Sequence, residues 1–341
     1  MAKTTEDKVK KKVQSKARSH VKRKVKNKVR KSPIIITILV LLAIAAALIW
    51  NFGDEWFGLS FNQTPEDSQQ SAAPAPLPDD EEILFHFIDV GQGDAILITT
   101  KSGNILIDTS ESGARTKLTS YLERANVSSF KYVIFTHTDA DHIGNADYIV
   151  KNYDIENVIM PDFTATTATY KRLLDALEDK IEQKGLNLIL IGEDDDCQHS
   201  GYTFRVGSLI NTIISPTKDY NDPNDMSIVM KSTYGSTSVM LTGDAESKPE
   251  QDILKEWAAS DLKCNVLKVG HHGSSSSTTQ AFLNAVDPTI AVISCGAGNK
   301  YGHPHDIVLD RLEKKGITVY RTDKDGTIVL KTDGKVFTYV E

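Results

Sequence analysis

Four side chains that can bind a metal ion fall within six consecutive positions, two histidines and two aspartates: His137, Asp139, Asp141 and His142. The apolar run 132–135 precedes them and reads as a buried strand that closes at Thr136. A turn at a strand end can aim all four side chains into one pocket, whereas on a strand His142 would face away from His137. A polar loop in which Asp141 caps a helix is the simpler alternative. Four metal-capable residues in this order favour a metal site.

Three further turns carry reactive side chains. Asp244 follows a strand and a glycine, and on its own it would read as a helix cap. His271 and His272 are adjacent in a turn flanked by glycines, where coordination or proton transfer is favoured over a structural role. His303 and His305 flank a proline. A structural role in the turn that begins a helix and a functional role are equally favoured for them.

The chain of 341 residues divides sharply in charge. Residues 1–33 hold 14 of the 39 Lys and Arg and two acidic residues, a net charge of +12. The remainder holds 25 basic and 44 acidic residues, a net charge of −19. A disordered basic tail and a nucleic-acid-binding segment are both possible readings of the first part. The sequence that follows it favours a third reading.

Residues 34–50 form a run of seventeen residues without a charge, long enough to span a bilayer if its flanks contribute. A cleaved signal peptide is the alternative, but the basic segment 1–33 is longer than the usual charged region of a signal peptide, and no small-residue cleavage site follows the apolar run. We therefore expect an uncleaved single-pass anchor with the N-terminus in the cytoplasm and the acidic bulk outside it. Membrane lipid would contact residues 1–57, with the basic segment against anionic lipid of the inner leaflet.

Residues 51–82, rich in Pro, Ser and Gln, read as an extended linker that leads to a folded domain over 83–341. The three cysteines, Cys197, Cys264 and Cys295, form no paired motif, so neither a disulfide scaffold nor a zinc knuckle is expected.

Short apolar strands alternate with amphipathic helices across the predicted domain. Strands are expected at 83–90, 95–100, 104–108, the segment ending at 136, 157–160, 186–191, 202–206, 208–215, 227–232, 238–242, 266–269, 290–294, 317–321, 326–331 and 336–339. Helices are expected at 114–125, 145–151, 167–184, 246–258, 278–286 and 305–315. Hairpins mixed with strand–helix–strand units predict two packed sheets with helices outside, an α/β (α+β) domain with αββα layering.

These motifs together resemble a known family. The segment 137–142 is similar to the first motif of the metallo-β-lactamase fold, in a variant with aspartate at the second histidine position. With 89–95, 241–244, 271–274 and 301–305 it resembles the C-terminal domain of the ComEC family of DNA-uptake proteins, in the same motif order over roughly 83–341. The resemblance does not extend to the multi-span membrane channel of that family.

The resemblance implies two divalent metal ions, Zn²⁺ or Mn²⁺, in a cleft at the edge between the sheets, with one-metal occupancy as an alternative. His137 and Asp139 would serve one ion and Asp141 and His142 the other, with Asp244 bridging and His271 or His272 completing the second. A catalytic role would fall to Asp141 at the ions and to His303 or His305 at the leaving group. Supporting positions would be Asp89, Gln92, Asp94, Asp108, Asn224 and Ser227.

The predicted function is therefore a membrane-tethered, extracytoplasmic, metal-dependent hydrolase, a phosphodiesterase or nuclease that uses a metal-bound hydroxide. The substrate would be a phosphoester, with DNA favoured by the resemblance. The acidic charge opposes a nuclease, because phosphate contacts normally come from basic residues, and Lys268 and Lys300 are expected to offset it locally. The alternatives are a phosphodiesterase for small or cell-envelope phosphoesters and a non-catalytic metal-binding surface module.

Overall fold

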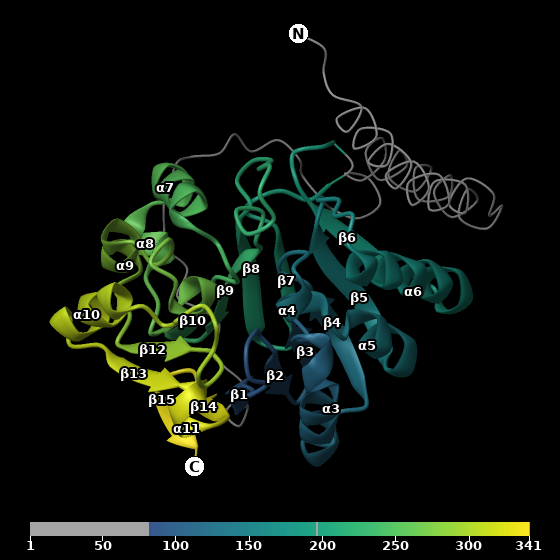
Figure 1. Cartoon of the computed structure of the whole chain (residues 1–341), viewed down its shortest axis with the longest axis horizontal. Helices are drawn as coiled ribbons and strands as arrows, with labels where there is room; N and C mark the ends of the chain where they lie inside the picture. The colour runs from purple at the N-terminus through teal and green to yellow at the C-terminus, as the bar shows by residue number, and fades with distance from the viewer. Residues whose placement is uncertain (1–81, 196, 341) are drawn as a thin grey trace, which may run out of the picture. The chain divides into compact units, whose positions relative to one another are not determined.

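The computed structural model describes residues 82–195 and 197–340, which form two β-sheets between two groups of helices (Figure 1). The first sheet contains, in spatial order, β15 (Phe337–Val340), β14 (Ile328–Thr332), β1 (Ile83–Phe87), β2 (Ile96–Thr100), β3 (Gly103–Ile107), β4 (Ser129–Ile134), β5 (Asp154–Pro161) and β6 (Asn187–Ile191). The second contains β13 (Thr318–Arg321), β12 (Ile290–Ile293), β11 (Val266–Lys268), β10 (Thr237–Leu241), β9 (Val229–Tyr234), β8 (Leu209–Ser215) and β7 (Thr203–Val206).

The helices separate into two sets, one beside each sheet (Figure 1). The set beside the first sheet comprises α3 (Arg115–Arg124), α4 (Ala140–Ile143), α5 (Ala146–Asn152) and α6 (Ala168–Lys184). The set beside the second comprises α7 (Ser247–Glu256), α8 (Ala259–Leu262), α9 (Gln280–Val286) and α10 (Asp306–Lys314). A single turn, α11 (Thr322–Asp325), and two short 3₁₀ segments, η1 (Ser112–Ala114) and η2 (Gly270–Gly273), complete the elements.

Three apolar cores hold these layers together. Successive side chains of a strand point to opposite faces of its sheet, so one strand contributes to two cores. In β2, Ile96 and Ile98 face the core between the two sheets, whereas Leu97 faces the core under α3, α5 and α6. In β11, Val266 faces the core between the sheets and Leu267 the core under α7, α9 and α10. Both sheets are thus buried on two faces, which confirms the predicted αββα layering.

Parallel strands bring the reactive turns to one edge. Strands β3, β4, β5 and β6 pair with one another in parallel, and so do β10, β11, β12 and β13. The carboxyl ends of parallel strands meet at the same edge of a sheet, where ligands of open α/β sheets bind. A backbone hydrogen bond from Ile228 N to Thr136 O, 2.9 Å, joins the two sheets at this edge.

The predicted elements are nearly all present, with shifted ends. The strand expected over 83–90 stops at Phe87, and the strand expected to close at Thr136 stops at Ile134. The one-turn helices α4, α8 and α11 were not predicted. Within the part of the chain described, no helix is long and apolar enough to cross a membrane. The predicted anchor at 34–50, the basic segment at 1–33 and residues 51–81 of the predicted linker lie outside the described residues.

Candidate metal centre

The metal-capable segment that follows β4 folds back on itself through α4. His137 and His142 are buried, with 1% and 0% of their surfaces exposed, while Asp139 and Asp141 are half-buried. Gly144 makes this possible, because a Cβ there would lie 2.4 Å from Ser112 N and 2.5 Å from Ser110 O. The α4 turn therefore swings His142 back toward His137, and their ring centroids lie 4.1 Å apart.

A second glycine fixes this segment from the other side. Gly93, in the turn between β1 and β2, has φ +104°, and a Cβ there would lie 2.1 Å from Asp141 O. Only glycine permits that approach. The following residue, Asp94, donates its backbone N–H to the same carbonyl, 3.3 Å away.

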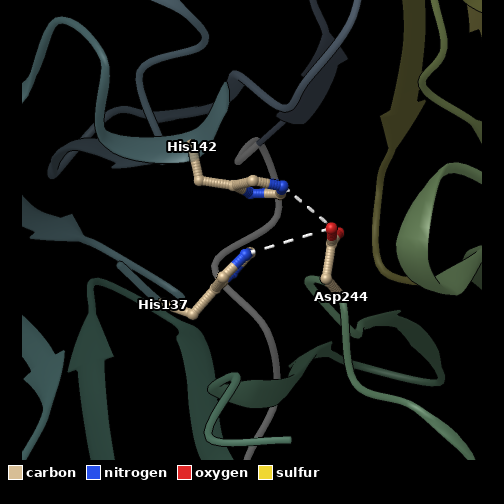
Figure 2. Close-up of side chains that lie close together, drawn as sticks. All are labelled: His137, His142 and Asp244. Atoms are coloured by element: carbon tan, nitrogen blue, oxygen red, sulfur yellow. Dashed lines mark ion pairs between the residues drawn. The ribbon is translucent and has the colours of Figure 1, made fainter. Parts of the chain in front are cut away.

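Asp244 is the point on which four imidazoles converge. Figure 2 shows its carboxylate facing His137 and His142, which reach it from the other sheet. His142 Nε2 lies 3.2 Å from Oδ1, and His137 Nε2 lies 3.9 Å from Oδ2. His272 Nε2 and His271 Nε2 lie 3.4 and 3.6 Å from Oδ2. Asp244 itself is held by its backbone N–H, which donates to Ser227 Oγ at 3.1 Å.

The adjacent histidines have different surroundings although both adopt left-handed backbone angles, φ +48° and +54°. Such angles are costly for a residue with a side chain and tend to mark functional sites. His272 is buried and donates Nδ1–H to Ser294 O at 2.9 Å, which leaves Nε2 facing the site. His271 is more exposed and has Nδ1 3.2 Å from Glu246 Oε1. Sequence reasoning missed Glu246 as a partner, although its position two residues after Asp244 was visible.

His142 is oriented by a buried carboxylate behind it. Asp108 Oδ2 lies 2.8 Å from His142 Nδ1 and accepts from Thr136 Oγ1 at 2.6 Å, while its Oδ1 accepts from Thr136 N at 2.8 Å. This fixes His142 with Nε2 toward the site, 3.2 Å from His272 Nε2. A carboxylate behind a histidine is the usual support of a metal ligand.

A buried ion pair lies behind His272. Lys268 Nζ is 2.9 Å from Asp94 Oδ2, with exposures of 0% and 1%, and Asp94 Oδ1 is 3.6 Å from His272 Nδ1. Lys268 cannot therefore face a substrate, so its expected role in offsetting acidic charge at the surface is wrong. Its burial could not be predicted from local patterns, since its partner Asp94 lies in the distant turn between β1 and β2.

The field of these carboxylates governs the protonation of the histidines. Burial opposes charge on His272, but Asp244 and Asp141 raise its pKa to about 9. Burial likewise opposes charge on His142, whose pKa Asp244 and Asp108 raise well above its usual value. Burial and then His142 lower the pKa of His137 to about 3. Against its own burial, Asp244 has a pKa well below the usual range because of His142 and His272.

The residues fit divalent metal ions. Four groups each bring one donor atom per member within 4.8 Å of the others: His137, His142 and Asp244; Asp141, His142 and His272; Asp94, Asp244 and His272; Asp94, Asp108 and His142. His137 Nε2 and Asp244 Oδ1 are buried without a hydrogen-bond partner. Such orphaned donor atoms are rare unless an ion satisfies them. Mixed imidazole and carboxylate ligands suit both Zn²⁺ and Mn²⁺.

Other predicted residues lie at the margin of this centre. Asp139 and His271 belong to none of the four groups, although His271 reaches Asp244. Asp89 shapes the turn, since its Oδ1 accepts from Gly91 N at 3.0 Å. Gln92 Oε1 accepts from Gly296 N at 3.3 Å, and Asn224 precedes β9 with Oδ1 unpartnered.

His303 and His305 lie across from the ligand cluster on the connection between β12 and α10. The His303 ring lies 5.5 Å from the His271 ring and 6.4 Å from the His272 ring, and its Nδ1 is unpartnered. Burial lowers the pKa of His303 to about 4, with neighbouring histidines acting in the same direction. His305 Nδ1 accepts from Ser275 N at 2.9 Å, so that nitrogen is occupied.

Comparisons with known proteins agree with this geometry. The family model of the metallo-beta-lactamase superfamily matches residues 88–297. The chain is 31% identical to ComE operon protein 3 of Bacillus subtilis, over 74% of this chain and 33% of that protein. It is 33% identical to Recombination protein 2 of Haemophilus influenzae, over 71% of this chain and 28% of that protein. The chain thus spans about a third of the length of these relatives.

Among solved structures, the metallo-beta-lactamase fold protein YhfI of Bacillus subtilis superimposes with a TM-score of 0.50 at 12% identity. The match covers 74% of this chain and all of that one. At that identity the likeness bears on the fold alone, and it agrees with the two packed sheets described above.

Proposed function

The chain belongs to the metallo-beta-lactamase superfamily of metal-dependent hydrolases, and from this premise we propose that it hydrolyses phosphodiester bonds in single-stranded nucleic acid. The observation that carries the proposal is the convergence of His137, His142 and His272 on the buried carboxylate of Asp244. A carboxylate shared by several imidazoles can bridge two cations, the arrangement used to displace phosphoesters. The name of one relative, Recombination protein 2, favours a nucleic acid as substrate.

In this proposal, His137 and Asp244 would hold one ion and Asp141, His142 and His272 would hold a second, with Asp139 and His271 as further possible ligands. Bound ions would supply Lewis acidity and a nucleophile from water at neutral pH. Asp108 keeps His142 Nε2 toward the site, and Lys268 keeps Asp94 behind His272. His303, neutral at pH 7, would donate a hydrogen bond to a phosphate oxygen.

A second candidate is a phosphodiesterase for small or cell-envelope phosphoesters. The observation that favours it is the net charge of −19 over residues 34–341, since long nucleic acids are repelled by such a surface. A metal-binding module without turnover is the non-enzymatic alternative.

The test uses the full chain, loaded with Mn²⁺ or Zn²⁺, with metal content measured alongside turnover. Substrates are a bis-aryl phosphodiester, single-stranded DNA and a lactam. We expect cleavage of the diester and of DNA. Cleavage of the diester alone would support the small-substrate candidate, and a metal-loaded chain that turns over nothing would support the binding module.

Asp244→Asn is the decisive variant, because the amide cannot bridge two cations. We expect loss of turnover below detection and a lower metal content. Asp333→Asn is the matched control, since Asp333 lies in the β14–β15 turn beside Ser236, at the opposite end of β10 from Asp244. An Asp244→Asn variant with unchanged rate would exclude the bridging role.

We further propose that the domain is tethered outside the cytoplasm. The support is the uncharged run 34–50 after a segment of net charge +12. Protease added to intact cells should then release the domain, whereas full protection until the cells are lysed would exclude this topology.

A further inference from the structure

One exposed aromatic side chain lies beside His303, next to the candidate metal centre, and belongs to none of the three apolar cores. Tyr301, on the connection between β12 and α10, is 50% exposed. The other large apolar side chains exposed to a similar degree within the described residues are Ile307 and Val336. An exposed tyrosine outside the cores is available to contact a bound substrate.

Tyr301 continues a row of rings that starts at the metal centre. Its ring stacks on the His303 ring, with centroids 5.6 Å apart and planes at 22°. The His303 ring in turn lies 6.4 Å from the His272 ring with planes at 29°. Through His303, these contacts link a candidate metal ligand to the exposed Tyr301 ring, on which a planar group can stack.

The loop that carries Tyr301 is held rigidly by Asn299. The Asn299 amide nitrogen donates to Gly296 O and His303 O, at 2.9 and 2.6 Å, and its oxygen accepts from Tyr301 N and His303 N, at 3.2 and 3.0 Å. His305 N donates to Gly273 O at 2.9 Å, which ties the loop to the turn of the adjacent histidines. A ring fixed before binding loses little conformational entropy on contact, which favours affinity.

A basic side chain accompanies the ring. Lys300 Nζ lies 4.9 Å from the Tyr301 ring centroid, and Lys300 is exposed. An exposed cation–π contact is weaker than the stacking of a base on an aromatic ring. An arriving base can therefore displace the ammonium, which is then free to pair with a phosphate beside that base.

We propose that Tyr301 is a stacking platform for a nucleobase of a single-stranded substrate, with Lys300 pairing to the adjoining phosphate. The inference rests on the proposed function and refines it. It also explains how a nucleic acid could bind a domain with a net negative charge. Base stacking does not need a basic surface, and charge repulsion does not remove the affinity that it supplies. Selection would fall on single strands, since paired bases are not available to stack.

The test compares binding of a short oligothymidylate with binding of an abasic oligonucleotide of equal length, both with phosphorothioate linkages that resist cleavage. The proteins are the full chain, Tyr301→Ala, Tyr301→Phe and the control Val336→Ala, whose side chain is 61% exposed at the opposite end of β10. We expect the parent chain to prefer the base-containing strand by about 5- to 150-fold. Tyr301→Ala should remove most of that preference, while Tyr301→Phe and Val336→Ala should keep it.

Equal binding of both oligonucleotides by the parent chain, or equal weakening of both by Tyr301→Ala, would overturn the platform. Turnover of the bis-aryl diester and of unmodified DNA is measured separately. A chain that prefers bases but cleaves nothing keeps the platform and loses the phosphodiesterase. A chain that cleaves DNA with no preference for bases does the reverse. Lys300→Ala should lower the slope of log affinity against log salt by about 0.7, and an unchanged slope would remove Lys300 from the site.

Discussion

Two parts of the candidate metal centre are built differently. The floor, which we define as Asp94, Asp108 and Lys268, is almost wholly buried, and each of its charges has an opposite charge or a hydrogen bond at 2.6–2.9 Å. The rim, the loop 295–305, is half-exposed and kept in place by backbone hydrogen bonds to one amide side chain. The floor therefore fixes the ligands, whereas the rim presents side chains to what approaches them.

The comparison predicts that the two sides fail in different ways. Changes in the floor should lower stability or metal affinity, since a buried charge without its partner is costly. Changes in the rim should lower turnover or substrate binding and leave the metal content unchanged.

His303→Ala in the rim should reduce kcat by about 10²- to 10⁴-fold, the usual worth of a positioned acid, base or phosphate-holding group. Metal content should stay at the parent level, because His303 belongs to none of the described ligand groups. His199→Ala, in an exposed loop before β7, is the matched control. Loss of metal from His303→Ala would break the division between floor and rim.

Lys268→Met in the floor should destabilise the fold by about 3–5 kcal/mol, because Asp94 would be left as a buried carboxylate without a lysine. Chemical denaturation followed by circular dichroism measures this. The double variant Asp94→Asn with Lys268→Met should recover part of the loss. Lys331→Met, which removes the exposed pair with Glu82, should change little, and a Lys268→Met as stable as the parent would contradict the role of the pair.

Glu250 on α7 gives a pH-dependent contrast, since it is a buried carboxyl held mainly by backbone N–H groups, and the nearby Arg311 guanidinium offsets only part of the cost of its burial. Its oxygens accept from Thr278 N and Thr279 N, which brace the segment after the adjacent histidines. Burial raises its pKa to about 7 from 4.5, although these hydrogen bonds oppose the rise. The folded state then binds this proton more tightly than the unfolded state, so the contribution of Glu250 to stability is fully present below pH 4.5 and is lost as the pH rises to about 7.

Glu250→Gln should remove that fall, which is on the order of 3–4 kcal/mol for about 2.5 pKa units at 1.36 kcal/mol per unit. The measurement is the free energy of unfolding at several pH values between 4.5 and 8. The exposed Glu313→Gln on α10 should keep the parent's slope. Identical slopes for Glu250→Gln and the parent would show that Glu250 is not protonated in the folded state.

Asp108→Asn should lower metal affinity by about 10- to 100-fold while the protein remains folded, because the amide still accepts from Thr136 but no longer fixes His142 by charge. Competition with a chelator measures the affinity, and Asp333→Asn is again the control. Unchanged affinity would mean that the floor supports the fold alone.

Much of this division was open to prediction. The mixture of hairpins with strand–helix–strand units predicted the layers, and the family resemblance implied a single site for His137, His142, Asp244 and one of His271 and His272. The choice between His271 and His272 was not, because it depends on left-handed backbone angles that no residue type there announces. Nor was the burial of Lys268, which follows from pairing with Asp94 at a sequence distance that local patterns do not cover. Tyr301 carried no signal beyond its neighbours, since its exposure depends on how Asn299 folds the loop.

The candidate ligands come from both sheets, His137 and His142 from the first, and Asp244 and His272 from the second. An ion bound among them would act as a cross-link between the two halves of the sandwich. Stability would then depend on metal concentration, with a gain of about 2.7 kcal/mol when the free ion is at 100 times its Kd. Metal supply would thus govern how long the fold resists proteolysis as well as how fast it works, and starvation for the ion would clear the protein from its surroundings.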